Sequence, residues 1–123
     1  MFLFSDTIYN NITLGRNISL DKVIAYAKDI EIDDFIKSLP GDYNYNVRER
    51  GGMLSMGQRQ LISFVRAYVN QPKILVLDEA TSSIDSESEY LIQRSSEKLT
   101  KDRTSIIVAH RLATPAFIIL KLY

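Results

Sequence analysis

The sequence predicts an α/β fold in which a parallel sheet follows a small helical unit. Two continuous apolar runs, "KILVLDEA" (73–80) and "RTSIIVAH" (103–110), have the length of strands, and their lack of alternation indicates burial on both faces. The segment between them, "SSIDSESEYLIQRSSEKL" (82–99), predicts a loop and then a helix. A strand, a helix and a strand in this order predict a βαβ unit with a right-handed crossover.

The N-terminal part of the chain predicts short helices between loops. Residues 1–20 mix short apolar runs with Asn, Gly and Ser, which predicts a loop with a short strand or helical turn. "DKVIAYAKDI" (21–30) predicts a helix with Asp21 as its N-cap, and "IDDFIKSLP" (32–40) predicts a second helix that ends at the proline. "GDYNYNVRERGG" (41–52) is rich in turn residues and predicts an ordered loop.

A longer helix is predicted from Ser55 to about Asn70. Its apolar residues recur on one face: Leu61, Phe64, Val65 and Tyr68. Ser55 suits the N-cap position, and Gly57 leaves the first turn without a side chain. Unpaired N–H groups and the positive end of the helix dipole meet at such a start, so it can bind an anion. An ordinary capped helix is the alternative that these residues alone leave open.

Composition and charge narrow the classes of function. The chain has 123 residues, of which 46% are hydrophobic, and this is enough for one domain. Fifteen basic residues balance fifteen acidic ones, and no Lys/Arg-rich block is present, so the sequence argues against a nucleic-acid partner. Cysteine is absent, which excludes disulfides and thiolate metal sites within these residues.

Polar residues end both predicted strands at the edge where ligands of open parallel sheets bind. Asp78 and Glu79 end the first strand, and His110 ends the second. An aspartate in this position can hold Mg²⁺, and a glutamate beside it can orient and deprotonate a water that attacks a phosphoryl group. Each residue alone also fits an ordinary role as a loop cap or a packed side chain. Together, at one edge, they favour a phosphoryl-transfer site.

Four segments resemble the motifs of ATP-binding cassette (ABC) ATPases, in the order and at the spacing of that family. They are "LSMGQRQ" (signature motif), "ILVLDEA" (Walker B strand), "TSSID" (D-loop) and "IIVAHR" (switch-histidine loop). "VRERGG" resembles the loop before the signature of exporter-type cassettes, and "FLFSDTIYNNI" resembles the segment after their Q-loop. The resemblance covers roughly residues 2–114. It implies a partial P-loop NTPase (RecA-like) core with a parallel sheet and an α-helical subdomain.

The resemblance implies a role for each matching residue on the side that faces a second subunit. In ABC dimers the signature helix of one subunit faces the γ-phosphate of ATP held by the other. Ser55, Gly57 and Gln58 are therefore expected to contact ATP. Asp85 is expected to cross the dimer interface.

The resemblance also assigns the strand ends. Asp78 is expected to hold Mg²⁺, and Glu79 is expected to be the general base for the attacking water. His110 is expected to sense the γ-phosphate. The cofactors that follow are ATP and Mg²⁺.

The sequence departs from the family in two places. The phosphate-binding motif G-x-x-x-x-G-K-[ST] is absent, and so are the Q-loop glutamine and the adenine-stacking aromatic expected upstream. Candidates for the stacking residue are Tyr9, Tyr43 and Tyr45, but each is better suited to packing or loop exposure. After "HRLAT" the family continues through a short helix, which Pro115 would break. We assign no function to residues 115–123, where "FIIL" predicts a strand.

Residues 1–123 are thus expected to form a partial ABC ATPase domain. About 1–70 would hold the Q-loop-distal segment, the helical subdomain and the signature helix, and about 71–123 would hold the Walker B, D-loop and switch-histidine half of the core. The expected function is ATP binding and hydrolysis in an exporter, although these residues alone are expected to be inactive without a P-loop. The expected partners are a second nucleotide-binding domain and transmembrane domains, at the cytoplasmic face of the plasma (inner) membrane.

Two alternatives remain open. The chain could be a non-hydrolytic donor of the signature motif to a complete cassette, in which case Glu79 would be dispensable. An ABC-type DNA-repair or chromosome ATPase is less favoured, because the charge balance is neutral and no heptad run is present.

Overall fold

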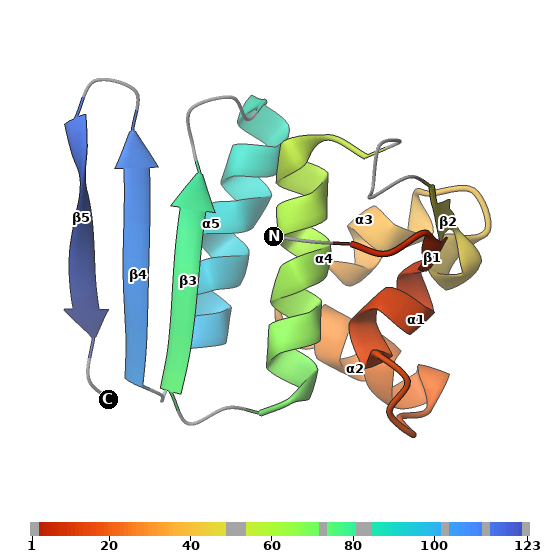
Figure 1. Ribbon diagram of the computed structural model, residues 1–123. Coiled ribbons are helices and arrows are strands. Elements are labelled where there is room, and N and C mark those ends of the chain that lie inside the picture. Colours follow the sequence, from red (N-terminus) through yellow and green to blue (C-terminus); the bar gives the residue numbers. More distant parts are fainter. Residues whose placement is uncertain are drawn as a thin grey trace.

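The computed structural model describes residues 3–48, 54–71, 74–80, 85–101, 104–111 and 114–121 (Figure 1). Its elements are, in chain order, β1 (Asp6–Thr7), α1 (Ile8–Thr13), α2 (Leu20–Asp29), α3 (Asp33–Lys37), the 3₁₀ turn η1 (Asp42–Asn44), β2 (Asn46–Val47), α4 (Met56–Val69), β3 (Ile74–Ala80), α5 (Ser86–Thr100), β4 (Thr104–Arg111) and β5 (Thr114–Lys121). The helices and strands of the second half lie where the sequence predicts them.

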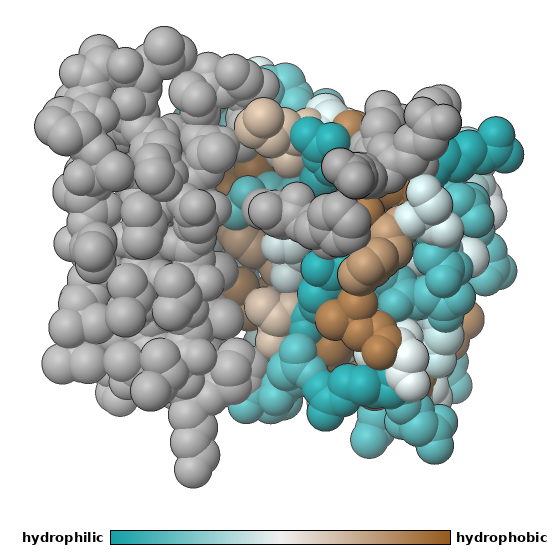
Figure 2. Space-filling view, in the orientation of Figure 1, coloured by the Kyte–Doolittle hydropathy of each residue, from teal (hydrophilic) through white to brown (hydrophobic). Residues whose placement is uncertain are grey.

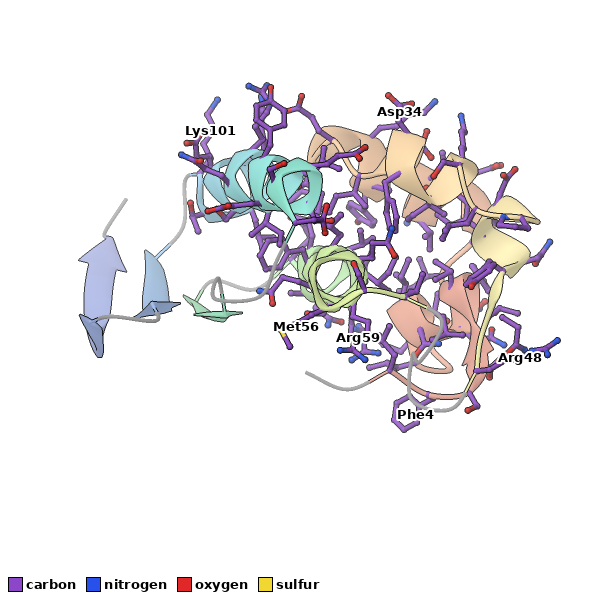
Figure 3. The ribbon with its side chains drawn as sticks, turned by 90° about the horizontal axis from the view of Figure 1, so that it is seen from above. Phe4, Asp34, Arg48, Met56, Arg59 and Lys101 are labelled. Carbon is purple, nitrogen blue, oxygen red and sulfur yellow. The ribbon has the colours of Figure 1, made fainter. Side chains whose placement is uncertain are left out.

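The elements form a sheet on one side and a helical unit on the other, with two helices between them. Figure 1 shows β3, β4 and β5 on the left and α1, α2 and α3 on the right, and Figure 3 shows the same order from above. α4 contacts α5 on one side and α1 and α2 on the other. The helix that begins at the predicted signature motif therefore lies in the middle of the molecule.

The larger sheet has the order β3-β4-β5. β3 and β4 are parallel, with Ile74 opposite Thr104 at one end and Ala80 opposite His110 at the other. In Figure 1 both strands point upward, β4 lies to the left of β3 and α5 lies behind the sheet, so the crossover is right-handed, as predicted. β5 pairs antiparallel with β4, so the described sheet is mixed and its parallel part is the β3–β4 pair.

The start of α2 corrects one prediction. Ser19, and not Asp21, is the N-cap: its backbone is extended, and its hydroxyl accepts a hydrogen bond from the N–H of Lys22 at 3.3 Å. Asp21 instead lies in the first turn and Lys28 in the last, where each charge suits the helix dipole. Both Ser19 and Asp21 are residue types that cap helices well, and the serine, two positions earlier, takes the role.

The core lies where α1, α2 and α4 meet. Three of the four residues predicted on the apolar face of α4 are buried, namely Leu61, Phe64 and Val65, whereas Tyr68 is half-buried. Arg66 also fixes α4 to α1, because its Nε donates to the carbonyl oxygen of Asn11 at 2.8 Å. α4 is thus held firmly on the side of the helical unit.

Large hydrophobic side chains also reach the surface. Figure 2 shows brown residues among teal ones on the face of the helical unit. The exposed large hydrophobic residues of the described chain are Phe4, Leu14, Leu20, Met56 and Tyr90. Single exposed apolar side chains are normal in globular proteins.

Candidate functional site

The start of α4 is closed by a reciprocal capping box. The hydroxyl of Ser55 accepts from the N–H of Gln58 at 3.1 Å, and Oε1 of Gln58 accepts from the N–H of Ser55 at 3.0 Å. Ser55 has the extended backbone of an N-cap residue. The predicted N-cap is confirmed. Gly57, which follows in the first turn, is buried.

The electrostatics of this helix start favour an anion. The first turn of α4 contains no acidic residue, so nothing within it offsets the positive end of the dipole. In the part of the chain that the structure describes, the N–H groups of Met56 and Gly57 make no hydrogen bond. Figure 3 shows Met56 and Arg59 projecting from this start on the side away from α5.

Arg59 is a candidate residue that the sequence prediction missed. It lies just after the capping box, its side chain is half-buried, and it makes no ion pair with another described residue. A cation next to a helix start adds to the attraction for an anion. Its position four residues after the N-cap serine is the sequence signal that could have identified it.

The register of β3 and β4 places the remaining candidates at one end of the parallel pair. Asp78 is opposite Val108, Glu79 is opposite Ala109, and Ala80 is opposite His110. The backbones of Asp78, Glu79 and His110 therefore come together at the carboxyl ends of the two strands. Their roles in chemistry stay predictions.

Asp85 is the N-cap of α5. Its carboxylate accepts from the N–H of Ser88 at 3.0 Å, and the side chain is exposed. Hydrogen bonding to Ser88, first through the backbone N–H, holds the pKa of Asp85 below its ordinary value. The carboxylate is therefore a cap within its own chain, and its expected place at a dimer interface stays a prediction. Residues 81–84 of the "TSSID" segment and 49–52 of "VRERGG" lie outside the described residues.

None of the described helices combines the length and the apolar character that a membrane crossing requires. Within the same ranges, no group of three or more His, Cys, Asp or Glu side chains could hold a metal ion. The role of Asp78 as a Mg²⁺ ligand stays a prediction.

Comparison with known proteins decides the family. The family model described as "ABC transporter" matches residues 1–82 of the chain. The chain belongs to the ABC transporter family. Membership implies the P-loop NTPase fold, and the resemblance drawn from the motifs is confirmed.

Two relatives illustrate which members of the ABC family this chain resembles. One relative is a Staphylococcus aureus protein named as a multidrug export ATP-binding/permease protein, and the two chains are 52% identical over 113 residues. This overlap covers 91% of this chain and 20% of the relative. This chain is 50% identical over 113 residues to ABC transporter B family member 13 of Arabidopsis thaliana, with 91% of this chain and 9% of the relative covered. The chain thus spans a fifth or less of the length of these relatives.

Proposed function

We propose that these residues form part of the ATP-binding domain of an ABC exporter, and that the whole protein hydrolyses ATP to drive transport across a membrane. In this proposal residues 1–70 supply the helical subdomain and the signature helix, and residues 71–123 supply the second half of a RecA-like core with parallel strands. The register of β3 and β4 carries the proposal, because it brings two carboxylate residues and a histidine to one end of the parallel pair. Ligands of open parallel sheets bind at that end.

The start of α4 is assigned to the γ-phosphate of ATP held by a second nucleotide-binding domain. In the capping box the hydroxyl oxygen of Ser55 accepts a hydrogen bond, which leaves its O–H free to donate to a phosphate oxygen. The backbone N–H of Gly57 and the side-chain amide of Gln58 are further donors at the same place. The absence of an acidic residue in the first turn fits a ligand with negative charge.

The strand ends are assigned to the metal and the attacking water. Asp78 would hold Mg²⁺, because carboxylate oxygens are the ligands that this ion prefers, and the ion would supply charge neutralisation to the phosphates. Glu79 orients and deprotonates the attacking water, and His110 hydrogen-bonds to the γ-phosphate. The adjacency of Glu79 and Ala80 to the end of β4 in the register supports this grouping.

The name of one relative supports the assembly that we propose. The name of the Staphylococcus aureus relative combines an ATP-binding part with a permease, which supports transmembrane domains as partners and a place at the cytoplasmic face of the plasma (inner) membrane. Asp85, at the start of α5, is assigned to the contact with the second nucleotide-binding domain. The balanced charge of the chain gives no support to a nucleic-acid partner.

A chimera tests this proposal. The 113 matching residues replace their counterparts in the Staphylococcus aureus relative, and ATP turnover of the purified chimera is measured. Glu79→Gln should lower turnover by about 100-fold or more, because a general base contributes about 10²–10⁴-fold. Glu89→Gln is the matched control, since Glu89 is exposed on the first turn of α5. Equal turnover in the Glu79→Gln chimera and its parent would contradict the assignment.

A second candidate function is a non-hydrolytic donor of the signature helix. The capping box of α4 is complete within these residues, so this helix start can face a phosphate held by another chain. In this case the chain pairs with a complete ABC nucleotide-binding domain in the presence of ATP. Ser55→Arg should abolish the pairing, and Glu79→Gln should leave it intact. Sedimentation of labelled chain with and without ATP measures the pairing. Turnover of the chimera separates the two functions, because Glu79→Gln should leave it unchanged only if the chain is a non-hydrolytic donor.

A further inference from the structure

A hollow of about 970 Å³ lies between α5 and residues 28–38, which comprise the end of α2, the turn after it and α3. We call residues 28–38 the α2–α3 corner. Phe35 and Lys37 line it on the side of the corner, and Tyr90 and Leu91 line it on the side of α5. The two walls come from parts of the chain that are far apart in sequence. Apolar packing does not fill the space between them.

One side-chain contact bridges this hollow. Nη2 of Arg94 on α5 donates to both carboxylate oxygens of Glu31, at 3.0 and 2.9 Å. The Arg94 guanidinium also lies 5.9 Å from the centroid of the Tyr90 ring, which steadies it on α5. Among the described residues, no other hydrogen bond or ion pair between side chains joins the corner to α5.

The corner is the rigid partner of the two. Ile30 and Ile32, on either side of Glu31, are buried in the core. The backbone of Glu31 is left-handed, with φ 63°, and the N–H of Ile32 closes the turn by donating to the carbonyl of Ala27 at 2.8 Å. A non-glycine residue keeps this strained conformation only where its surroundings hold it. The Glu31 carboxylate is therefore presented from a fixed position.

The first half of α5 buries few hydrophobic side chains. Within residues 86–94, Ile92 is buried and Leu91 is half-buried, whereas Tyr90 is exposed. In the second half, the hydroxyl of buried Ser95 has no hydrogen-bond partner among the described residues. Because little apolar area is buried in residues 86–94, a contact between side chains can contribute noticeably to the position of this half of the helix.

We propose that Glu31 and Arg94 form a latch that holds α5 against the α2–α3 corner. Closing it fixes the first half of α5, which begins at Ser86 after its N-cap Asp85, and opening it lets this half move relative to the corner while the core around α4 stays packed. Both side chains are partly exposed, 43% for Arg94 and 39% for Glu31, so salt or a competing charged group weakens the latch. The latch itself does not depend on ATP. Only an effect on the pairing of two nucleotide-binding domains, through Asp85 at the start of α5, rests on the proposed function.

Hydrogen–deuterium exchange of the whole chain, without nucleotide, tests the latch. Glu31→Gln and Arg94→Gln should each speed exchange in residues 86–94 by about two- to five-fold, which is the range for an exposed ion pair. The double variant should show the same increase and no more, and 1 M salt should produce it in the unmodified chain. Lys37→Gln is the matched control, because it breaks the ion pair between exposed Lys37 and buried Asp33 within α3 and removes no hydrogen bond or ion pair to α5.

A double variant in which the two charges are exchanged distinguishes loss of the ion pair from unfolding of the variant. Glu31→Lys combined with Arg94→Glu should restore slow exchange in residues 86–94. Unchanged exchange in both single variants, or increases that add in the double glutamine variant, would overturn the latch. These outcomes do not involve ATP turnover, so the latch and the proposed function can fail separately.

Discussion

Replacing Ser55 with aspartate separates the two properties of the start of α4, its stability and its affinity for an anion. Aspartate caps a helix about as well as serine, and its charge suits the dipole by about 0.3–1 kcal/mol. The N–H of Gln58, which now donates to Ser55 at 3.1 Å, would have a carboxylate acceptor instead. The free energy of unfolding should therefore stay the same or rise by up to about 1 kcal/mol.

The same substitution should abolish contact with a phosphate. Two unit charges about 4 Å apart repel by about 4 kcal/mol at an effective dielectric constant of about 20, which is a factor of about 1,000 in binding. Urea unfolding of the chain measures the stability, and ATP turnover of the Staphylococcus aureus chimera measures the function. Ser55→Ala is the control, since it removes the cap at a cost of about 1 kcal/mol without adding a charge.

Two results would refute this reasoning. Full turnover in the Ser55→Asp chimera would show that no anion approaches the start of α4. A loss of stability in Ser55→Asp as large as that in Ser55→Ala would show that the capping box does not tolerate a carboxylate.

Two further predictions concern the buried polar groups. The hydroxyl of buried Tyr43 donates to Asp33 at 2.6 Å, so Tyr43→Phe should lower the free energy of unfolding by about 1.5–3 kcal/mol in urea titrations. Burial, and then Asp33, raises the pKa of Tyr43 above its ordinary value of 10.0. The contribution of Tyr43 to the free energy of unfolding is therefore complete below pH 10 and is lost as the pH rises further. Unfolding measured over a pH series should show this decline in the unmodified chain and not in Tyr43→Phe. Ser95→Ala removes a buried hydroxyl that has no partner among the described residues, so it should leave the melting temperature unchanged or raise it, and a clear decrease would contradict this.

Local signals in the sequence predict much of the site. The capping box needs only Ser55 and Gln58, three residues apart, and the N-cap of α4 follows from that spacing. The parallel pair follows from two apolar runs on either side of a helix, and their polar ends mark Asp78, Glu79 and His110. These features depend on neighbours in the chain, which a single sequence displays.

Contacts between distant parts of the chain could not be predicted in the same way. Glu31 and Arg94 are 63 residues apart, and only the packing of α2 and α5 on either side of α4 brings them together. The choice of Ser19 over Asp21 as the cap of α2 was also open, because both residue types cap helices well. The antiparallel pairing of β5 with β4 depends on which edge of the sheet is available, a property of the folded chain.

Exchange at the start of α4 tests the central claim most directly. The chain is mixed with the complete nucleotide-binding domain of the Staphylococcus aureus relative, and deuterium uptake in residues 54–60 is followed with and without ATP and Mg²⁺. If this helix start faces a phosphate held by the partner, uptake there should slow only when both ATP and the partner are present, and Ser55→Asp should remove the effect. Uptake that ATP and the partner leave unchanged would contradict the claim.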